Sequence, residues 1–254
     1  MGRLLQKTAG CIAASLLTIA ASSADIVVYD NFPSNAVIPQ IGMTSEINTS
    51  LVDQTWTVDD AFMATPATGI TRIDWVGERV IGANVAYPSA EFLIVPAEQD
   101  PNGVWNPAPL NSPNAILQSN LAYTANANIA DPNPSDNLVP YTGSIVFPAA
   151  VIPASQRFYV GVRLSGNGRG RNYFVPTTID GTVTGLSGGY TKADLFTGLS
   201  GPDAWKQSSD TFYGSPAGTQ PAFEFAFRLY SVPEPGSLGL LLIGLAAVGL
   251  RKRI

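Results

Sequence analysis

Apolar and polar side chains alternate along much of the chain between residues 25 and 232. The alternation is longest in two segments, residues 157–164 (RFYVGVRL) and 222–230 (AFEFAFRLY). A period of two is typical of a β-strand with one buried face. The side chains that this pattern places on the buried faces are Phe158, Val160, Val162 and Leu164 in the first segment, and Phe223, Phe225, Phe227 and Leu229 in the second.

Shorter apolar runs predict further strands. They lie at residues 25–30, 54–58, 70–76, 90–95, 143–147 and 172–175, separated by clusters of Gly, Pro, Asn and Ser. No stretch between 25 and 232 shows a three-turn amphipathic helix. We therefore expect one all-β domain over residues 25–232, an antiparallel β-sandwich or jelly roll, with the proline-rich segments 96–114 and 128–140 as loop insertions.

Residues 1–24 have the layout of a secretory signal peptide. Two basic residues precede a mostly apolar stretch over 9–21, and small residues lead to a predicted cut between Ala24 and Asp25. Export through the Sec machinery follows from this layout. Cys11 is the only cysteine in the chain, so the predicted mature protein has none and folds without disulfides.

The last residues, 233–254 (PEPGSLGLLLIGLAAVGLRKRI), change character abruptly. Residues 236–250 form a run of 15 uncharged, largely apolar residues, and three cations follow it. As a helix this run covers about 22 Å at 1.5 Å per residue, whereas a bilayer core is about 30 Å thick. The cations favour a cytoplasmic C-terminus. The pattern predicts a short, single membrane helix.

This tail resembles the PEP-CTERM sorting signal of exported bacterial envelope proteins. The matching features are a Pro-Glu-Pro motif, a short Gly/Leu-rich span and a basic end, and the residues that carry them are Pro233, Glu234, Pro235, Arg251, Lys252 and Arg253. The resemblance implies recognition and processing by an exosortase-type membrane protease, in bacteria that make extracellular polysaccharide. The alternative is an uncleaved single-span anchor.

A second, looser resemblance lies in residues 54–80. Many PEP-CTERM proteins carry a strand ending in a V-A-D-D-F-like motif, followed by an I-x-x-V-x-W-x-G-like strand, in domains similar to lectin-like jelly rolls. Here Ala61 separates Asp59-Asp60 from Phe62. This extra residue turns Phe62 to the opposite face of the strand unless a bulge absorbs it.

Charge and composition exclude several classes of function. The formal net charge is −5, and because the first 24 residues and the tail carry +2 each, residues 25–232 carry −9. An acidic domain is unsuited to nucleic acid, whose binding requires neutralisation of phosphates. The chain has no histidine, which excludes Ser-His-Asp and Cys-His catalysis and imidazole zinc sites.

Calcium is the one metal that the sequence suggests, and no other cofactor is expected. The segment DPNPSDN offers the hard oxygen ligands Asp131, Asn133 and Asp136. It lacks the glycine and distal glutamate of an EF-hand, and Asx-Pro sequences commonly form ordinary turns. A plain loop is the alternative. Asp59 and Asp60 point to opposite faces of a strand and cannot chelate together.

Five residues are candidates for ligand binding. Arg163, Arg169 and Arg171 concentrate positive charge in the glycine-rich segment 163–174, which we expect to be a hairpin connection. Guanidinium groups there could grip an anionic sugar. Trp105 and Trp205 lie in loop-like segments, where an indole ring can stack on a sugar or simply pack over the domain. Trp56 and Trp75 fall in strands and are expected in the core.

Together these features predict an exported surface or extracellular-matrix protein with a structural or adhesive role, associated with polysaccharide. A dedicated carbohydrate-binding module is the alternative. A carbohydrate-active enzyme is a further alternative, because glycoside hydrolysis needs only two carboxylates at a suitable separation. No Asp or Glu falls in a recognisable catalytic motif, so we expect that the protein is not an enzyme.

Overall fold

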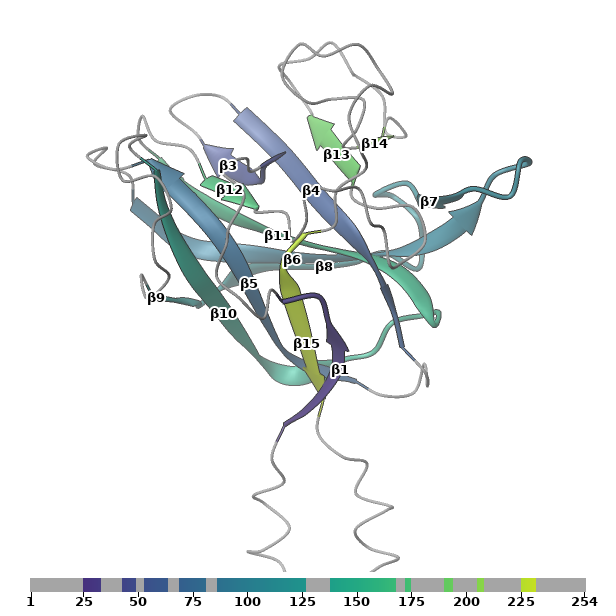
Figure 1. The fold of residues 1–254 in the computed structure, drawn as a ribbon, viewed down its shortest axis with the longest axis horizontal. Coiled ribbons are helices and arrows are strands. Elements are labelled where there is room, and N and C mark those ends of the chain that lie inside the picture. The colour runs from purple at the N-terminus through teal and green to yellow at the C-terminus, as the bar shows by residue number, and fades with distance from the viewer. Residues whose placement is uncertain are drawn as a thin grey trace, which may run out of the picture.

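The computed structural model describes residues 25–32, 43–48, 53–63, 69–80, 86–126, 138–167, 172–174, 190–193, 205–207 and 225–231. These residues form strands arranged in two sheets (Figure 1). The seven-stranded sheet contains β1 (Ile26–Asp30), β2 (Met43–Thr44), β5 (Ile70–Val80), β9 (Thr124–Asn126), β10 (Leu138–Val151), β12 (Asn172–Phe174) and β15 (Phe227–Ser231). The eight-stranded sheet contains β3 (Glu46–Asn48), β4 (Asp53–Phe62), β6 (Ala86–Gln99), β7 (Trp105–Pro107), β8 (Ile116–Leu121), β11 (Arg157–Asn167), β13 (Tyr190–Ala193) and β14 (Lys206–Gln207).

Strand pairing is antiparallel at every described contact except that between β3 and β11, which is parallel. The seven-stranded sheet runs in the order β1-β15-β5-β10-β9, and the eight-stranded sheet in the order β14-β13-β4-β3-β11-β6-β7. Neighbours in both sheets are therefore often distant in the sequence. The all-β sandwich that the alternation predicted is confirmed, since two largely antiparallel sheets share one core.

Every strand that the apolar runs predicted is present. The predicted segments overlap β1, β4, β5, β6, β10, β11, β12 and β15. The last of these strands begins only at Phe227, and the predicted core residue Phe223 lies outside the described residues. The prediction that 96–114 is a loop is partly wrong, because β6 continues to Gln99 and β7 follows at Trp105–Pro107. The proline-rich composition of this segment led to the prediction of a loop. Proline is nevertheless tolerated in edge strands, and β7 is such a strand.

The expected hairpin at residues 163–174 is also wrong. β11 pairs with β3, β4 and β6 in one sheet, whereas β12 pairs with β2 and β5 in the other. The connection between them therefore passes from sheet to sheet. Two strands that are adjacent in the sequence pair only when their exposed edges meet, and here β11 already has neighbours on both sides.

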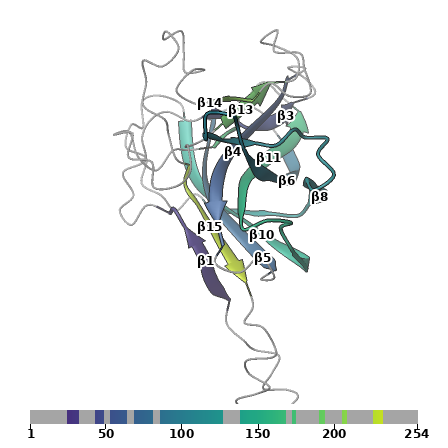
Figure 2. The ribbon, with the colours of Figure 1, turned by 90° about the vertical axis from the view of Figure 1, so that its right-hand side faces the viewer.

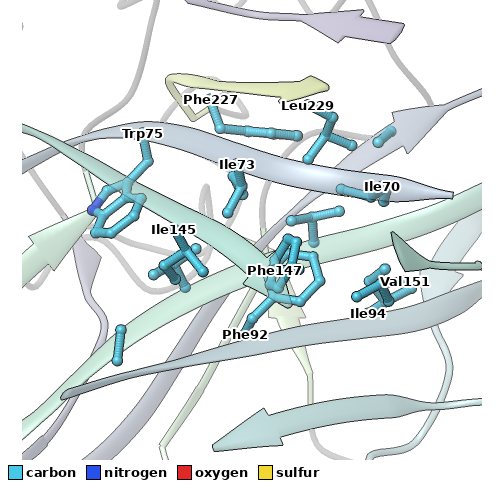
Figure 3. Close-up of a cluster of buried hydrophobic side chains, with 14 of the residues drawn as sticks. Ile70, Ile73, Trp75, Phe92, Ile94, Ile145, Phe147, Val151, Phe227 and Leu229 are labelled. Atoms are coloured by element: carbon cyan, nitrogen blue, oxygen red, sulfur yellow. The ribbon is translucent and has the colours of Figure 1, made fainter. Parts of the chain in front are cut away.

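The core lies between the two sheets. Phe92 and Ile94 of β6 point toward side chains of β5, β10 and β15 (Figure 3). The ring centroids of Phe92 and Phe147 are 4.6 Å apart, so the two sheets interlock at this contact. The alternation predicted the core-facing side chains correctly in the two longest segments. The core contains Phe158, Val160, Val162 and Leu164 of β11, Phe227 and Leu229 of β15, and Phe225 just before β15.

A second apolar cluster lies on the outer face of the eight-stranded sheet. It consists of Trp56, Val58, Leu93, Val95, Ala108 and Tyr159. Residues after β6 fold back over it, anchored by a hydrogen bond from the backbone N–H of Ala108 to the carbonyl of Pro96 (2.8 Å). β6 and β11 are consequently buried on both faces, and the expected burial of Trp56 and Trp75 is confirmed.

The two ends of the described chain meet. β1 pairs antiparallel with β15, and Ile26 lies directly opposite Ser231. Both views of the ribbon show the two strands side by side at one end of the molecule (Figures 1 and 2). The residue after the predicted signal cleavage and the last residue before the tail therefore leave the sandwich at the same place.

Candidate functional site

An exposed aromatic residue and an arginine lie beside Trp105 at the rim of the eight-stranded sheet. Phe62 at the end of β4 lies opposite Arg157 at the start of β11. The Arg157 guanidinium carbon is 5.9 Å from the centre of the Phe62 ring and 4.7 Å from that of Trp105. We call Phe62, Trp105 and Arg157 the aromatic patch. It joins three strands, β4, β11 and β7, that the sequence separates widely.

The extra residue in β4 explains why Phe62 is exposed. The register from Phe62–Arg157 to Val58–Gly161 continues without a bulge. Ala61 therefore points into the core, and Phe62 points out, with 48% of its surface exposed. The expectation that the inserted alanine turns Phe62 to the other face is confirmed.

Trp105 is held by a rigid hairpin. Its carbonyl accepts a hydrogen bond from the Tyr159 hydroxyl (3.0 Å). In the turn before it, an Asp100 carboxylate oxygen accepts from the backbone N–H groups of Asn102 (2.8 Å) and Val104 (2.9 Å). Gly103 supplies the positive φ of 84° that this turn requires. The indole is thus positioned before any ligand arrives.

Trp205 lies on the same outer face as Trp105, but it packs against the protein. Its indole N–H donates to the carbonyl of Ala108 (3.0 Å), and its ring covers the second apolar cluster. The structure therefore brings both predicted tryptophans to the segment 105–108. Trp105 faces Arg157 at the rim of the sheet. Trp205 instead contacts Ala108, in the segment after β6 that covers the second apolar cluster.

Arg163 lies in a different environment from the one expected. It belongs to β11, is only 7% exposed, and lies opposite Glu91 of β6. Its Nε and Nη2 both donate to the same Glu91 carboxylate oxygen at 2.7 Å, and its guanidinium lies 4.1 Å from the centre of the Trp56 ring. This geometry gives Arg163 a packing role in the sheet. Arg169 and Arg171 lie outside the described residues.

The other predicted sites are only partly described. The calcium candidates Asp131, Asn133 and Asp136 lie outside the described residues, and the part of the chain that is described holds no group of three metal-ligating side chains. Asp59 and Asp60 point to opposite faces, as expected. Asp59 is buried in the sandwich, where its carboxylate accepts from the backbone N–H of Phe225 (2.6 Å), which ties β4 to the C-terminal strand.

A polar network lies beside the paired termini, on the outer face of the seven-stranded sheet. Arg72 donates to both carboxylate oxygens of Asp74, lies 4.3 Å from the centre of the Tyr230 ring and is 3.9 Å from Asp25. The Tyr230 hydroxyl also donates to Asp74 (2.9 Å). Burial opposes ionisation of Asp74, but hydrogen bonds from Arg72, Ser144 and Tyr230 outweigh it and lower the pKa of this carboxyl.

Sequence reasoning missed Phe62 and Arg157 as site residues. Arg157 begins a strand and carries no motif, and Phe62 had been considered only as part of a fold resemblance. The signal was available in part, because counting residues along the strand turns Phe62 outward, but a single exposed apolar residue is common and does not by itself mark a site. Its neighbours could not be known without the strand order.

Of the residues that form the two predicted processing sites, the structure describes only Asp25. Asp25 is described, whereas Ala24 and the motif residues Pro233, Glu234, Pro235, Arg251, Lys252 and Arg253 are not. Among the residues that the structure describes, none belongs to a helix of the length and apolarity needed to cross a bilayer. The predicted signal peptide and tail helix thus remain predictions from the sequence.

Comparison with known proteins identifies the tail. Residues 231–253 match the family described as the PEP-CTERM protein-sorting motif. No curated protein and no solved structure matches the chain. The match begins at Ser231, the last residue of β15, so the motif follows the folded sheet with no intervening spacer.

Proposed function

We propose that this protein, which its PEP-CTERM motif marks as an exosortase-sorted, exported envelope protein, has a structural and adhesive role at the cell surface or in the extracellular matrix, in association with polysaccharide. The aromatic patch is the observation that carries the proposal. The short apolar run of the tail holds the chain in the membrane until an exosortase cuts it, after which the domain joins the surface or the matrix.

The chemistry of the patch suits a sugar polymer. Aromatic rings offer flat apolar faces that stack on the C–H faces of sugar rings, and a guanidinium offers several hydrogen-bond donors to hydroxyl and carboxylate groups. Phe62 and Arg157 are both exposed, and Trp105 is half-buried beside them. Rigid strands hold all three, so that little conformational entropy is lost on binding.

The charge of the domain confines any contact with an anionic group of the polymer to Arg157 in the patch. Residues 25–232 carry a formal charge of −9, which repels acidic polysaccharide from most of the surface. Arg157 provides a local positive charge within the patch. Binding is therefore expected to weaken with added salt, since exposed charges are screened over about 8 Å at physiological ionic strength.

The test is co-sedimentation of the mature protein with the exopolysaccharide of its own host. Phe62→Ala and Trp105→Ala should each release most of the bound protein, and Arg157→Gln should remove the salt dependence. Leu117→Ala is the matched control, because Leu117 is an exposed apolar residue on the same face. Retention of all variants, or a wild-type protein that neither binds the polymer nor self-associates, would contradict the adhesive role.

A dedicated carbohydrate-binding module is the second candidate, and the pre-positioned indole of Trp105 favours it. The two roles differ in stoichiometry. A module should bind a defined oligosaccharide at one saturable site by calorimetry, and Trp105→Ala should abolish that binding while the fold persists. An adhesive protein should bind only long polymer, with an affinity that rises with chain length.

We propose no catalytic role. Several described carboxylates have structural partners: Asp74 contacts Arg72, Glu91 contacts Arg163, and Asp30 contacts Arg228. At Asp74 these contacts lower the pKa of the carboxyl, whereas a general acid needs a carboxyl that keeps its proton near neutral pH. Release of reducing sugar or of an unsaturated product from the host polymer would overturn this proposal.

A further inference from the structure

Large apolar side chains are exposed around the place where both termini leave the sandwich. Seven such side chains are exposed in the described part of the chain, and four of them lie at this end of the seven-stranded sheet. We call these four the exit corner: Ile26, Val27, Val146 and Ile152, which are between 43% and 71% exposed.

Strand register places Val27 and Val146 at the two ends of one row across the outer face of the sheet. Val27 of β1 lies opposite Tyr230 of β15, Tyr230 opposite Arg72 of β5, and Arg72 opposite Val146 of β10. Neighbouring strands are about 4.8 Å apart, so this row crosses the outer face of the sheet in about 15 Å.

The next row toward the sheet end begins with Ile26 at the edge and ends at Val151, the residue before Ile152. Ile26 lies opposite Ser231, Ser231 opposite Ile70, and Ile70 opposite Val151. Ile152 follows Val151 directly. Its side chain passes close to Gly69, since a Cβ at Gly69 would lie 3.5 Å from the Ile152 Cγ1 atom.

The apolar tail that follows the described residues indicates which surface the exit corner contacts. The apolar run of the tail begins at Gly236, only five residues after Ser231. A fully extended chain covers at most about 17 Å over that separation. The predicted signal peptide ends at Ala24, two residues before Ile26 of this corner.

We propose that the exit corner rests on the lipid bilayer while the tail is still in place, with these aliphatic side chains in the headgroup region. This rests on the proposed function, in which the tail is held in the membrane before processing. Tyr230 and Arg72 suit this position, because tyrosine and arginine combine an apolar body with a polar tip and are favoured at membrane interfaces.

The charges at the corner are compatible with a lipid surface. Asp74 and Asp25 contact Arg72, and Asp30 contacts Arg228 at 2.9 Å. The carboxylates that face outward here therefore lie beside guanidinium groups. The domain would then stand on the membrane by its paired termini, and the Pro-Glu-Pro motif would lie at the bilayer surface, where a membrane protease works.

Depth-dependent fluorescence quenching tests the proposal. The full chain carrying Cys11→Ser has no other cysteine, so Val146→Cys, Ile152→Cys and the control Leu117→Cys can each be labelled with one environment-sensitive fluorophore. The chain is reconstituted by its tail into vesicles of phosphatidylethanolamine and phosphatidylglycerol that contain spin-labelled lipid. Circular dichroism checks that each variant folds.

We expect spin-labelled lipid to quench the labels at positions 146 and 152, with a blue shift of emission, and aqueous iodide to quench only the label at 117. Equal quenching of all three labels by iodide would overturn the proposal. Protection of 146 and 152 only after exosortase is added would assign the corner to the protease instead of to lipid. Failure of the full chain to float with vesicles would overturn both the membrane-held tail and this inference.

Discussion

At the residue scale, two aromatic–glycine pairs shape the core. On β5 and β10, Trp75 lies opposite Gly143, and Gly77 lies opposite Tyr141. Each large ring lies over the glycine across from it, and the two rings meet edge to face with centroids 6.5 Å apart. The missing side chains of the glycines make room for rings that would otherwise collide with the neighbouring strand.

Gly143→Ala should therefore destabilise the protein by about 2–3 kcal/mol, the range for overpacking a well-filled core. A Cβ at this position would lie 2.1 Å from Trp75 Cζ2, and the buried indole cannot withdraw. Chemical unfolding of the mature protein measures the loss. Trp75→Leu in the same background should recover part of it, and a Gly143→Ala protein as stable as wild type would contradict the packing described.

Asp74 makes a pH-dependent contribution at the same scale. Because hydrogen bonds lower its pKa in the folded state, its stabilisation is fully present above the unfolded value of about 3.9 and is lost as the pH falls through the folded value. Asp74→Asn should cost about 1–2 kcal/mol at pH 7. The difference between wild type and variant should shrink as the pH falls below the unfolded value of about 3.9, as followed by urea midpoints. A difference that stays constant over this range would exclude the linkage.

At the element scale, the outer face of β11 decides how the eight-stranded sheet is stabilised. Alternation alone predicts that this face is exposed, yet Tyr159 and Arg163 are both buried on it. The covering layer from residues 96–115 removes Tyr159 from solvent, while Glu91 and Trp56 enclose Arg163. Tyr159 therefore belongs to the second apolar cluster, and Arg163 is buried beside Trp56 of the same cluster.

Glu91→Ala should cost about 3 kcal/mol, because it leaves the Arg163 guanidinium buried without its carboxylate partner. Glu98→Ala is the control. Glu98 lies on the same strand but is exposed, and its loss should change stability by less than about 0.5 kcal/mol. Equal effects of the two substitutions on the denaturant midpoint would show that the Arg163–Glu91 pair contributes nothing.

At the scale of the whole molecule, the antiparallel pairing of β1 and β15 links sorting to folding. The match to the sorting motif begins at Ser231, where the sheet ends. The matched residues thus begin where the last strand ends, and β1 is the outer neighbour of that strand. Cleavage at both ends would leave the two new termini side by side.

The intact mass of the mature protein from its own host should correspond to a chain that starts at Asp25 and ends between about Pro233 and Ser237, in the envelope or the medium. Processing at the Pro-Glu-Pro motif is the reason for this end point, because residues 231–253 match the sorting motif. A mass that ends at Ile254, in the membrane fraction, would show instead that the tail stays as an anchor.

The sequence by itself determined the eight strands that its apolar runs mark, the residues of the long strands that face the main core, and the sorting signal. These features are local: a period of two follows from strand geometry, and a short linear motif is read in an extended chain. The outward turn of Phe62 also followed from counting residues. Composition alone excluded histidine chemistry.

Only the tertiary structure decided which strands are neighbours, and the candidate site depends on that choice. Phe62, Arg157 and Trp105 meet because β4, β11 and β7 end at one rim. Arg163 became a packing residue because β6 presents Glu91 opposite it, and the glycine-rich connection crosses between sheets because β11 has no vacant edge. Strand pairing depends on contacts between residues far apart in the chain, and alternation within one strand carries no record of its partners.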